Sequence, residues 1–281
     1  MRNHIFFIPL LYTYNTRLRN FTKTMSLVII YFIPVIYLMV IEGHEILPFK
    51  DIILLGCFAV ICLYNVYEIG YIQNDTETIR IDNSPTVRLL PENLNYYEKH
   101  KTIIYIERLF LSFMFALLMF FLIGNNKAYI LFEISLIIIL LLYQLYNRVR
   151  CQILVINYFL LISIRYISPL LLFLDKLSIE LVLTALMIFP IVKTICFKGD
   201  NPGNYIYSLW FRKYILRNNT EKLTEYRVIA YTIMFIVSLG LYLIHIISIY
   251  CIIPILYMLF YRFIIWMAIL AGFKPFGYLK G

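Results

Sequence analysis

The chain has 281 residues, of which 62% are hydrophobic and 17% aromatic, and its mean hydropathy is +0.80. Soluble domains are nearer about 45–50% apolar, so the composition excludes an ordinary soluble enzyme and predicts a polytopic membrane protein. The formal net charge of +9 is divided among the segments between apolar runs, which argues against a nucleic-acid-binding surface. The five cysteines include no CxxC pair and there is no cluster of histidines, so neither a disulfide framework nor a zinc site is predicted.

The apolar runs predict about eight membrane-spanning helices, since each is near the roughly 20 residues that a span requires. The N-terminal run Ile5–Tyr12 is too short to be one, and no small-residue cleavage site follows it. No polar loop separates the last two spans. The expected fold is therefore all-α, a single membrane domain over residues 1–281, with spans at Met25–Ile41, Ile52–Gln73, Thr102–Ile123, Tyr129–Tyr146, Ile153–Leu174, Ile179–Cys196, Val228–Ile247 and Ile252–Gly272.

Basic residues alternate between the two sides of this arrangement. They precede the first span and follow the fourth, sixth and eighth, whereas the other short loops carry few of them. The positive-inside rule then predicts a multi-pass protein with both termini in the cytoplasm. Two long loops, 74–101 and 197–227, are expected on the same side, and long loops in a tight bundle are often lids or binding segments.

An acidic stripe runs along the end of the second span. Its members advance by three or four residues, so they share one face if the helix continues through them: Tyr64, Glu68, Tyr71, Asp75, Thr78 and Asp82. A carboxylate within the bilayer costs about 2.5–3.5 kcal/mol on insertion scales, so this face is expected to meet protein, water or a ligand. Glu68, about two turns before Asp75, is interpreted either as a base or acceptor-orienting group, or as the partner of a neighbouring cation.

The residues after the second span have the chemistry of a diphosphate site. Oxygen ligands such as Asn74, Asp75 and Asp82 suit Mg²⁺, which takes one or two carboxylates and bridges to substrate phosphates. Arg80 and Arg88 can neutralise the remaining phosphate charge. The two long loops together therefore predict a diphosphate-binding site at the cytoplasmic face.

These residues resemble a known family. Asn74-Asp75-x-x-Thr78-x-x-x-Asp82 is similar to the first aspartate-rich motif of the UbiA superfamily of intramembrane prenyltransferases, Asn-Asp-x-x-Asp-x-x-x-Asp, and its flanks Gly70-Tyr71 and Pro85-Thr86-Val87-Arg88 are similar too. The family carries this motif after its second helix and another after its sixth. Two departures stand out, because Thr78 replaces the middle aspartate and the later loop offers only Asp200 where the family has two or three carboxylates.

The resemblance implies about nine spans around a central cavity, and Mg²⁺-assisted transfer of a prenyl group from a prenyl diphosphate to a lipophilic or aromatic acceptor. It implies metal binding by Asn74, Asp75, Asp82 and Asp200, with Asp75 and Asp82 also catalytic beside Glu68. Aromatic walls would stabilise a developing positive centre. The expected substrate contacts are Tyr71, Arg80, Arg88, Arg165, Lys193 and Lys198.

Several of these residues also have a structural interpretation. Arg165 lies within the fifth span and Arg262 within the eighth. An intramembrane arginine is a functional candidate by default, although a structural pair with Glu68 or Glu107 explains either arginine equally well. Lys193 either holds a phosphate or extends to the interface.

Two other functions remain open from the sequence. Within the same fold, the protein would move a phosphoribosyl group from phosphoribosyl diphosphate to a polyprenyl phosphate, as one branch of the superfamily does. Alternatively, it is a non-enzymatic transporter or flippase subunit with Glu68, Arg165 and Arg262 along a path, although no internal repeat of the kind common in transporters is evident. The expected partners are a diphosphate donor, a lipophilic acceptor and membrane lipid.

Overall fold

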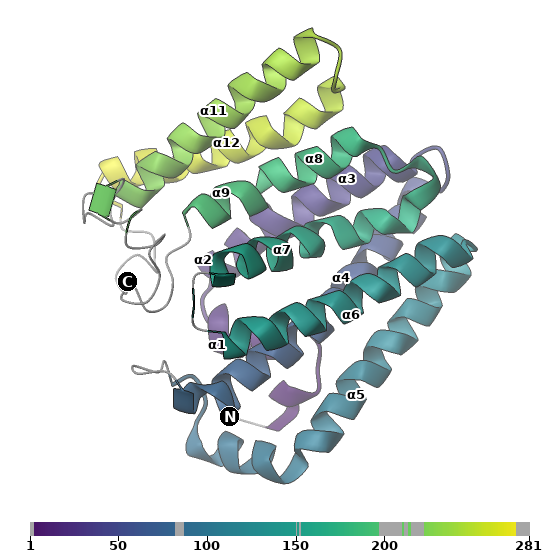
Figure 1. The fold of residues 1–281 in the computed structure, drawn as a ribbon, viewed down its shortest axis with the longest axis vertical. Coiled ribbons are helices and arrows are strands. Elements are labelled where there is room, and N and C mark those ends of the chain that lie inside the picture. Colours follow the sequence, from purple (N-terminus) through teal and green to yellow (C-terminus); the bar gives the residue numbers. More distant parts are fainter. Residues whose placement is uncertain are drawn as a thin grey trace.

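The computed structural model describes residues 3–81, 87–149, 151, 153–196, 210, 213–214 and 222–273, with the side chains of residues 80 and 81 excepted. Every regular element within these ranges is helical (Figure 1). Seven helical segments of the described chain are long and apolar enough to cross a membrane. The structure is thus a membrane-type helical bundle, as the composition predicts.

The chain begins with two short helices that precede the first span, η1 (Asn3–Phe6) and α1 (Leu11–Arg17). The first span then combines α2 (Phe21–Leu27), the π-helical η2 (Val28–Phe32) and α3 (Ile33–Gly43). Pro34 has no N–H to donate within the helix. The carbonyl of Ile30, four residues earlier, instead accepts a hydrogen bond of 2.8 Å from the hydroxyl of Tyr166. This irregular part of the first span is therefore joined directly to a later helix.

Helix α4 (Phe49–Thr76) is the centre of the bundle: 72% of its most apolar stretch is buried, against 11% for α11 (Leu223–Leu243). α5 (Pro91–Ile123) and α6 (Asn126–Arg148) both pack against α4. A Cβ on Gly70 would lie 2.3 Å from the ring of Tyr143, so the glycine lets α4 and α6 approach closely. The acidic stripe thus belongs to the most enclosed helix.

The predicted sixth span, Ile179–Cys196, is broken. It consists of α8 (Ile179–Ile188) and α9 (Pro190–Ile195), and the intervening Phe189 has φ −147° and ψ −48°. Proline at the start of α9 cannot donate to a continuing helix, which explains the break. Neither piece is long enough to count among the seven long helices, so the expected total of eight or nine spans is not reached by unbroken helices in the described residues.

The remaining helices complete the bundle. α7 (Ile153–Ile167) continues into the 3₁₀ segment η4 (Ser168–Lys176), which packs against α6 and α3. α11 and α12 (Ile249–Leu270) form a hairpin that lies at the opposite side of the bundle from α5 (Figure 1). The last two spans, which the sequence left without a clear boundary, are separated by a turn that contains His245 at φ 59°.

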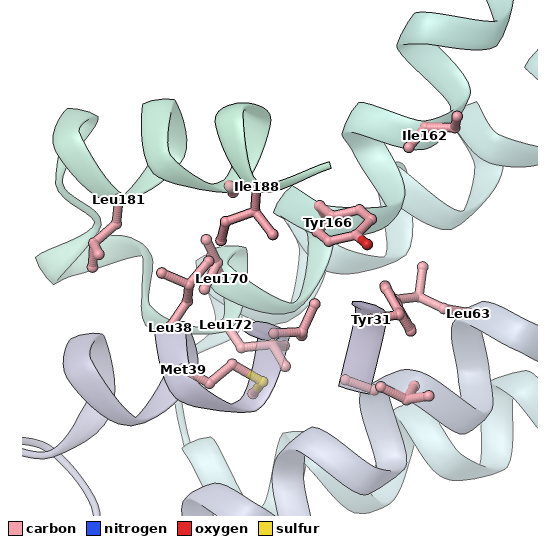
Figure 2. Close-up of a cluster of buried hydrophobic side chains, with 14 of the residues drawn as sticks. Tyr31, Leu38, Met39, Leu63, Ile162, Tyr166, Leu170, Leu172, Leu181 and Ile188 are labelled. Atoms are coloured by element: carbon pink, nitrogen blue, oxygen red, sulfur yellow. The ribbon is translucent and has the colours of Figure 1, made fainter. Parts of the chain in front are cut away.

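Buried side chains from the first span, α7, η4 and α8 meet in the core shown in Figure 2. Tyr31 and Tyr166 contact each other edge to face, with ring centroids 5.1 Å apart. By contrast, large apolar side chains are exposed on the outer helices, among them Phe110, Phe121, Ile236 and Phe260. An apolar exterior on long helices is typical of contact with lipid.

The predicted loop 74–101 is largely helical. α4 continues to Thr76, η3 covers Thr78–Ile81 and α5 begins at Pro91, about three turns before the predicted start of the third span. The acidic stripe therefore leaves the α-helix after Thr76, and the assumption of one continuous face is wrong beyond Asp75. Asp82 lies outside the described residues.

Glu77, just past the end of α4, fixes the start of α5. Its carboxylate is 2.8 Å from Lys101 Nζ and accepts hydrogen bonds from the hydroxyls of Tyr97 and Tyr105. Burial raises the pKa of Glu77, but these donors lower it by more, so its net pKa falls below the ordinary 4.5. A depressed carboxyl pKa means that the ionised form stabilises the folded state.

The stability difference between wild type and Glu77→Gln is therefore expected to be complete above the pKa of unfolded glutamate and to disappear as the pH falls through the folded pKa. Thermal unfolding of the detergent-solubilised proteins between pH 7 and pH 3 measures it. Glu92→Gln, an exposed carboxylate at the start of α5, is the control and should show little effect at any pH. A Glu77 difference that is as large at pH 3 as at pH 7 contradicts the assignment.

Candidate functional site

A cavity of about 450 Å³ opens beside the ends of α4 and α6 and extends between the first span, α7 and α9. Among the residues that the structure describes, its walls carry five basic side chains and no carboxylate. A low-dielectric hollow lined by charges of one sign concentrates the opposite charge. The basic residues are Arg17, Lys23, Arg88, Arg165 and Lys193, and the aromatic ones are Tyr31, Tyr67, Tyr71, Tyr143, Tyr146, Tyr158 and Phe189.

Asp75 lies directly behind the basic rim of this cavity. Its carboxylate is 1% exposed and accepts two bonds from Arg17, at 2.8 and 3.2 Å, and one from Arg88, at 2.9 Å. The hydroxyl of Tyr12 donates a further bond of 2.9 Å. Asp75 thus holds both guanidinium groups at the wall, and we refer to Arg17 and Arg88 together as the rim clamp.

The electrostatics keep Arg17 of the rim clamp cationic. Burial lowers the pKa of Arg17, but Asp75 and Tyr71 raise it by more, so the guanidinium stays charged. Burial and the adjacent Asp75 carboxylate raise the pKa of Tyr12 well above its ordinary value, so its hydroxyl remains a donor. The guanidinium of Arg17 also lies 3.7 Å from the ring centre of Tyr71, which orients it further.

The described residues do not by themselves form a Mg²⁺ site. Both oxygens of Asp75 already accept hydrogen bonds from arginines, and the amide of Asn74 lies 3.4 Å from one of them. A metal ion here would compete with two guanidinium groups for the same oxygens. In the structure, Asp75 binds the rim clamp, and its metal-binding role stays a prediction. The other expected ligands, Asp82 and Asp200, lie outside the described residues.

Arg165 occupies the other end of the cavity, in a box of tyrosines. Its guanidinium lies 4.1 Å from the ring centre of Tyr31, 5.0 Å from that of Tyr64 and 5.2 Å from that of Tyr67. Its Nε has no hydrogen-bond partner in the described part of the chain. With a helical rise of about 1.5 Å per residue, Tyr64 and Tyr67 lie about 6–10 Å along α4 from Tyr71, the ring that contacts Arg17. The cavity therefore has two cationic ends.

Lys193 reaches the same cavity from α9, beside Phe189. The break at Pro190 separates α9 from α8, so the irregular backbone that shortens the sixth span also contributes to the cavity wall. Non-helical backbone at membrane depth is tolerated where it is buried in protein or lines a polar cavity.

Glu68 does not line the cavity. It is fully buried about two turns before Asp75, on the face of α4 that α1 covers, where Arg108 donates to it at 2.6 Å. The backbone N–H groups of Thr13 and Leu10 donate to the same carboxylate at 2.6 and 3.1 Å. Of the two interpretations of Glu68, the structure favours the buried ion pair, with Arg108 rather than Arg165 as the cation. These contacts give no support to the catalytic role expected for Glu68, which stays a prediction.

The structure brings together five of the residues predicted from sequence. Tyr71, Asn74, Arg88, Arg165 and Lys193 all line the cavity. Of the others, Lys198 and Asp200 lie outside the described residues, and only the backbone of Arg80 is described, within η3. Arg262 is buried beside Tyr261 and does not line this cavity.

Sequence reasoning missed four residues of this region: Tyr12, Arg17, Lys23 and Arg108. The first three precede or begin the first span, where basic residues were explained by membrane topology. The only local signal was the apolar Ile5–Tyr12 run, which is too short to span and yet too apolar for a free terminus. No pattern in the sequence associates that run with α4.

A larger hollow of about 790 Å³ lies between η1 and the start of α5, among His4, Glu92, Tyr96 and His100. Its walls carry a carboxylate beside a single lysine and include no residue of the acidic stripe, so it is the weaker candidate. No family model, curated protein or solved structure matches the chain, and the site is therefore interpreted from its own residues.

Proposed function

We propose that the cavity binds the phosphate groups of an amphiphilic substrate, and that the protein is a membrane-embedded transferase of the UbiA type. It would move a prenyl group from a prenyl diphosphate to a lipophilic or aromatic acceptor. The observation that carries this proposal is a cavity with five basic residues, no described carboxylate and an aromatic wall, next to the motif that resembles the UbiA family.

The rim clamp matches the needs of a diphosphate leaving group. Two arginines provide planar, charge-assisted donors, and such bonds to phosphate are about twice as strong as neutral ones. Donors that are already oriented stabilise negative charge as it develops on the departing oxygen, without reorganising at that moment. Asp75 supplies this orientation through its bonds to Arg17 and Arg88.

The aromatic wall suits the other half of such a substrate. Tyr67, Tyr71 and Tyr143 contact one another edge to face at ring distances of 4.6 to 5.8 Å. Tyrosine faces pack against an isoprenoid chain and are attracted to a positive carbon centre. Since small-molecule sites commonly occupy about 300–1,000 Å³, a cavity of about 450 Å³ accommodates a diphosphate and the first part of a chain.

Mg²⁺ remains part of this proposal only through Asp82 and Asp200. No mechanistic step is assigned to it, because Asp75 is engaged by arginines. The described cations offer an alternative way of neutralising diphosphate.

Phosphoribosyl transfer to a polyprenyl phosphate is the second candidate, favoured by the separation of Arg165 from the rim clamp. The α4 rings that contact Arg165 lie one to two turns before Tyr71, which contacts Arg17, so the two cationic groups are offset along α4. Two phosphorylated substrates would occupy them both. Under prenyl transfer, Arg165 would instead meet a polar group of the acceptor.

Membranes containing the protein, supplied with either labelled prenyl diphosphate or labelled phosphoribosyl diphosphate, distinguish the two reactions. We expect label to enter the lipid fraction from one donor, with Arg88→Gln reducing the rate by about tenfold or more, because one charged hydrogen bond to the leaving group is lost. Each arm is run with Mg²⁺ and with a chelator. Lys50→Gln, an exposed cation at the far end of α4, is the matched control. Label from neither donor, or an Arg88→Gln rate equal to wild type, contradicts the proposal; movement of unmodified lipid alone would favour the transport alternative.

A further inference from the structure

We infer that the N-terminal segment Asn3–Arg17 is a fixed support that places Arg17 in the cavity wall, and that Glu68, about two turns before Asp75 on α4, is the positioning residue that holds it. This inference rests on the proposed binding of phosphate groups by the rim clamp. The proposed reaction uses neither Glu68 nor most of the segment Asn3–Arg17 directly, and this inference gives both of them a role.

The buried pair of Glu68 and Arg108 ties this segment to α4 and α5. Besides its bond to Glu68, the Arg108 guanidinium donates to the backbone carbonyls of Phe6, at 2.7 Å, and Ile5, at 3.3 Å. It also bonds Asn65 Oδ1 at 2.9 Å. One fully buried guanidinium thus connects α4 with the carbonyls of η1, and few side chains other than arginine have enough donors to do so.

Glu68 provides the matching acceptor for the start of α1. It receives the N–H groups of Leu10 and Thr13, which have no partner within the helix at its first turn. Leu10 has φ 67°, a left-handed conformation that is unfavourable for a residue with a side chain. The bond from its N–H to Glu68 offsets part of that strain. The direction in which α1 leaves this turn therefore depends on the carboxylate.

The other end of α1 delivers the functional group. Arg17 is the last residue of the helix, and Tyr12, on the same helix, donates to Asp75. One helix thus bonds Glu68 through its first turn, and bonds Asp75 through both Tyr12 in that turn and Arg17 at its end. The two carboxylates of the stripe together fix α1, and the result of this arrangement is a guanidinium held at the cavity wall.

Only one arginine of the rim clamp depends on this device. Arg88 follows the connection after α4 and is not part of the N-terminal segment. Loss of Glu68 should therefore weaken anion binding through Arg17 and leave the contribution of Arg88 in place. A general loss of structure would weaken the contributions of both arginines, so an effect confined to Arg17 indicates that Glu68 positions Arg17.

The test measures the affinity of the full-length protein in lipid nanodiscs for inorganic pyrophosphate, with Mg²⁺ and with a chelator. We expect Arg17→Gln to weaken binding about tenfold, as the loss of one charged contact does, and Glu68→Gln to weaken it about fivefold to tenfold. A double-mutant cycle compares the effect of Glu68→Gln on pyrophosphate affinity in different backgrounds. In the Arg17→Gln variant, Glu68→Gln should cause no further loss of affinity, whereas in the Arg88→Gln variant it should cause the same loss as in wild type.

Glu42→Gln is the matched control. Glu42 is also a buried carboxylate that accepts a backbone N–H, from Ser178 at 2.9 Å, but it lies at the other end of the bundle. It should leave pyrophosphate affinity unchanged. If Glu68→Gln does not yield a folded protein, Glu68→Asp keeps the charge beside Arg108 and shortens its reach to α1, and the same cycle applies.

Hydrogen exchange supplies a readout that does not require a ligand: Glu68→Gln should increase exchange at the amides of residues 10–17. Unchanged exchange there, or effects of Glu68→Gln and Arg17→Gln on affinity that simply add, overturn the positioning role while leaving the proposed function intact. Absence of pyrophosphate binding by wild type, or equal binding by Arg88→Gln, overturns both.

Discussion

Replacing Arg108 with Met is expected to lower the free energy of unfolding by about 3–5 kcal/mol, one of the largest effects available in this chain. The substitution leaves Glu68 as a buried carboxylate without its cation, since both side chains are 0% exposed. It also removes the donors to the carbonyls of Ile5 and Phe6. Thermal or denaturant-induced unfolding of the detergent-solubilised protein measures the loss.

Two further variants make this expectation specific. Lys127→Met removes an exposed cation from the start of α6 and should change stability by no more than about 0.5 kcal/mol. The double substitution of Glu68→Leu with Arg108→Met should be less destabilising than Arg108→Met alone, because no charge is then left buried. An Arg108→Met protein that unfolds like wild type would show that this pair does not anchor the fold.

Replacing Arg165 with Met is expected to separate stability from function. Arg165 lies among tyrosines, and no carboxylate of the described residues forms an ion pair with it, so its contacts with the rings offset only part of the cost of burying its charge. Methionine keeps the length of the side chain and favourable contact with aromatic rings. The variant should unfold at the same or a higher temperature, whereas turnover of the labelled donor should fall by about tenfold or more.

Arg165→Lys is the informative companion. It keeps the positive charge but loses the planar group that stacks on tyrosine faces, so an intermediate rate is expected. A strongly destabilised Arg165→Met protein would indicate that the arginine is structural, and a fully active one would remove Arg165 from the site.

The fold class followed from the sequence because membrane insertion depends on local composition. A run of about 20 apolar residues is long enough to span a bilayer wherever it lies in the chain, so most helices could be located individually. The exception is Ile179–Cys196, where composition predicts a span and Pro190 breaks it. The predicted third span also began too late for α5, because the first turns of this helix are polar and hydropathy detects only its apolar part.

The candidate site was less accessible to such reasoning. Spacing placed Tyr71 and Asp75 on one face of the second span, but it could not indicate that Asp75 would bind two arginines from other segments. Helical periodicity places residues on a face only approximately, and it does not say which segment covers that face. Here α1 covers it, and both carboxylates accept hydrogen bonds from that helix.

The sequence by itself determined that this chain is a helical membrane protein with polar chemistry concentrated at the end of its second long helix, since hydropathy and local spacing are sufficient for both. Only the tertiary structure decided which charges meet. Arg17, Arg88 and Arg165 come from separate segments of the chain, and a common cavity arises from long-range packing around α4. Electrostatic interactions depend on distance in space, and the order of residues along the chain does not encode that distance directly.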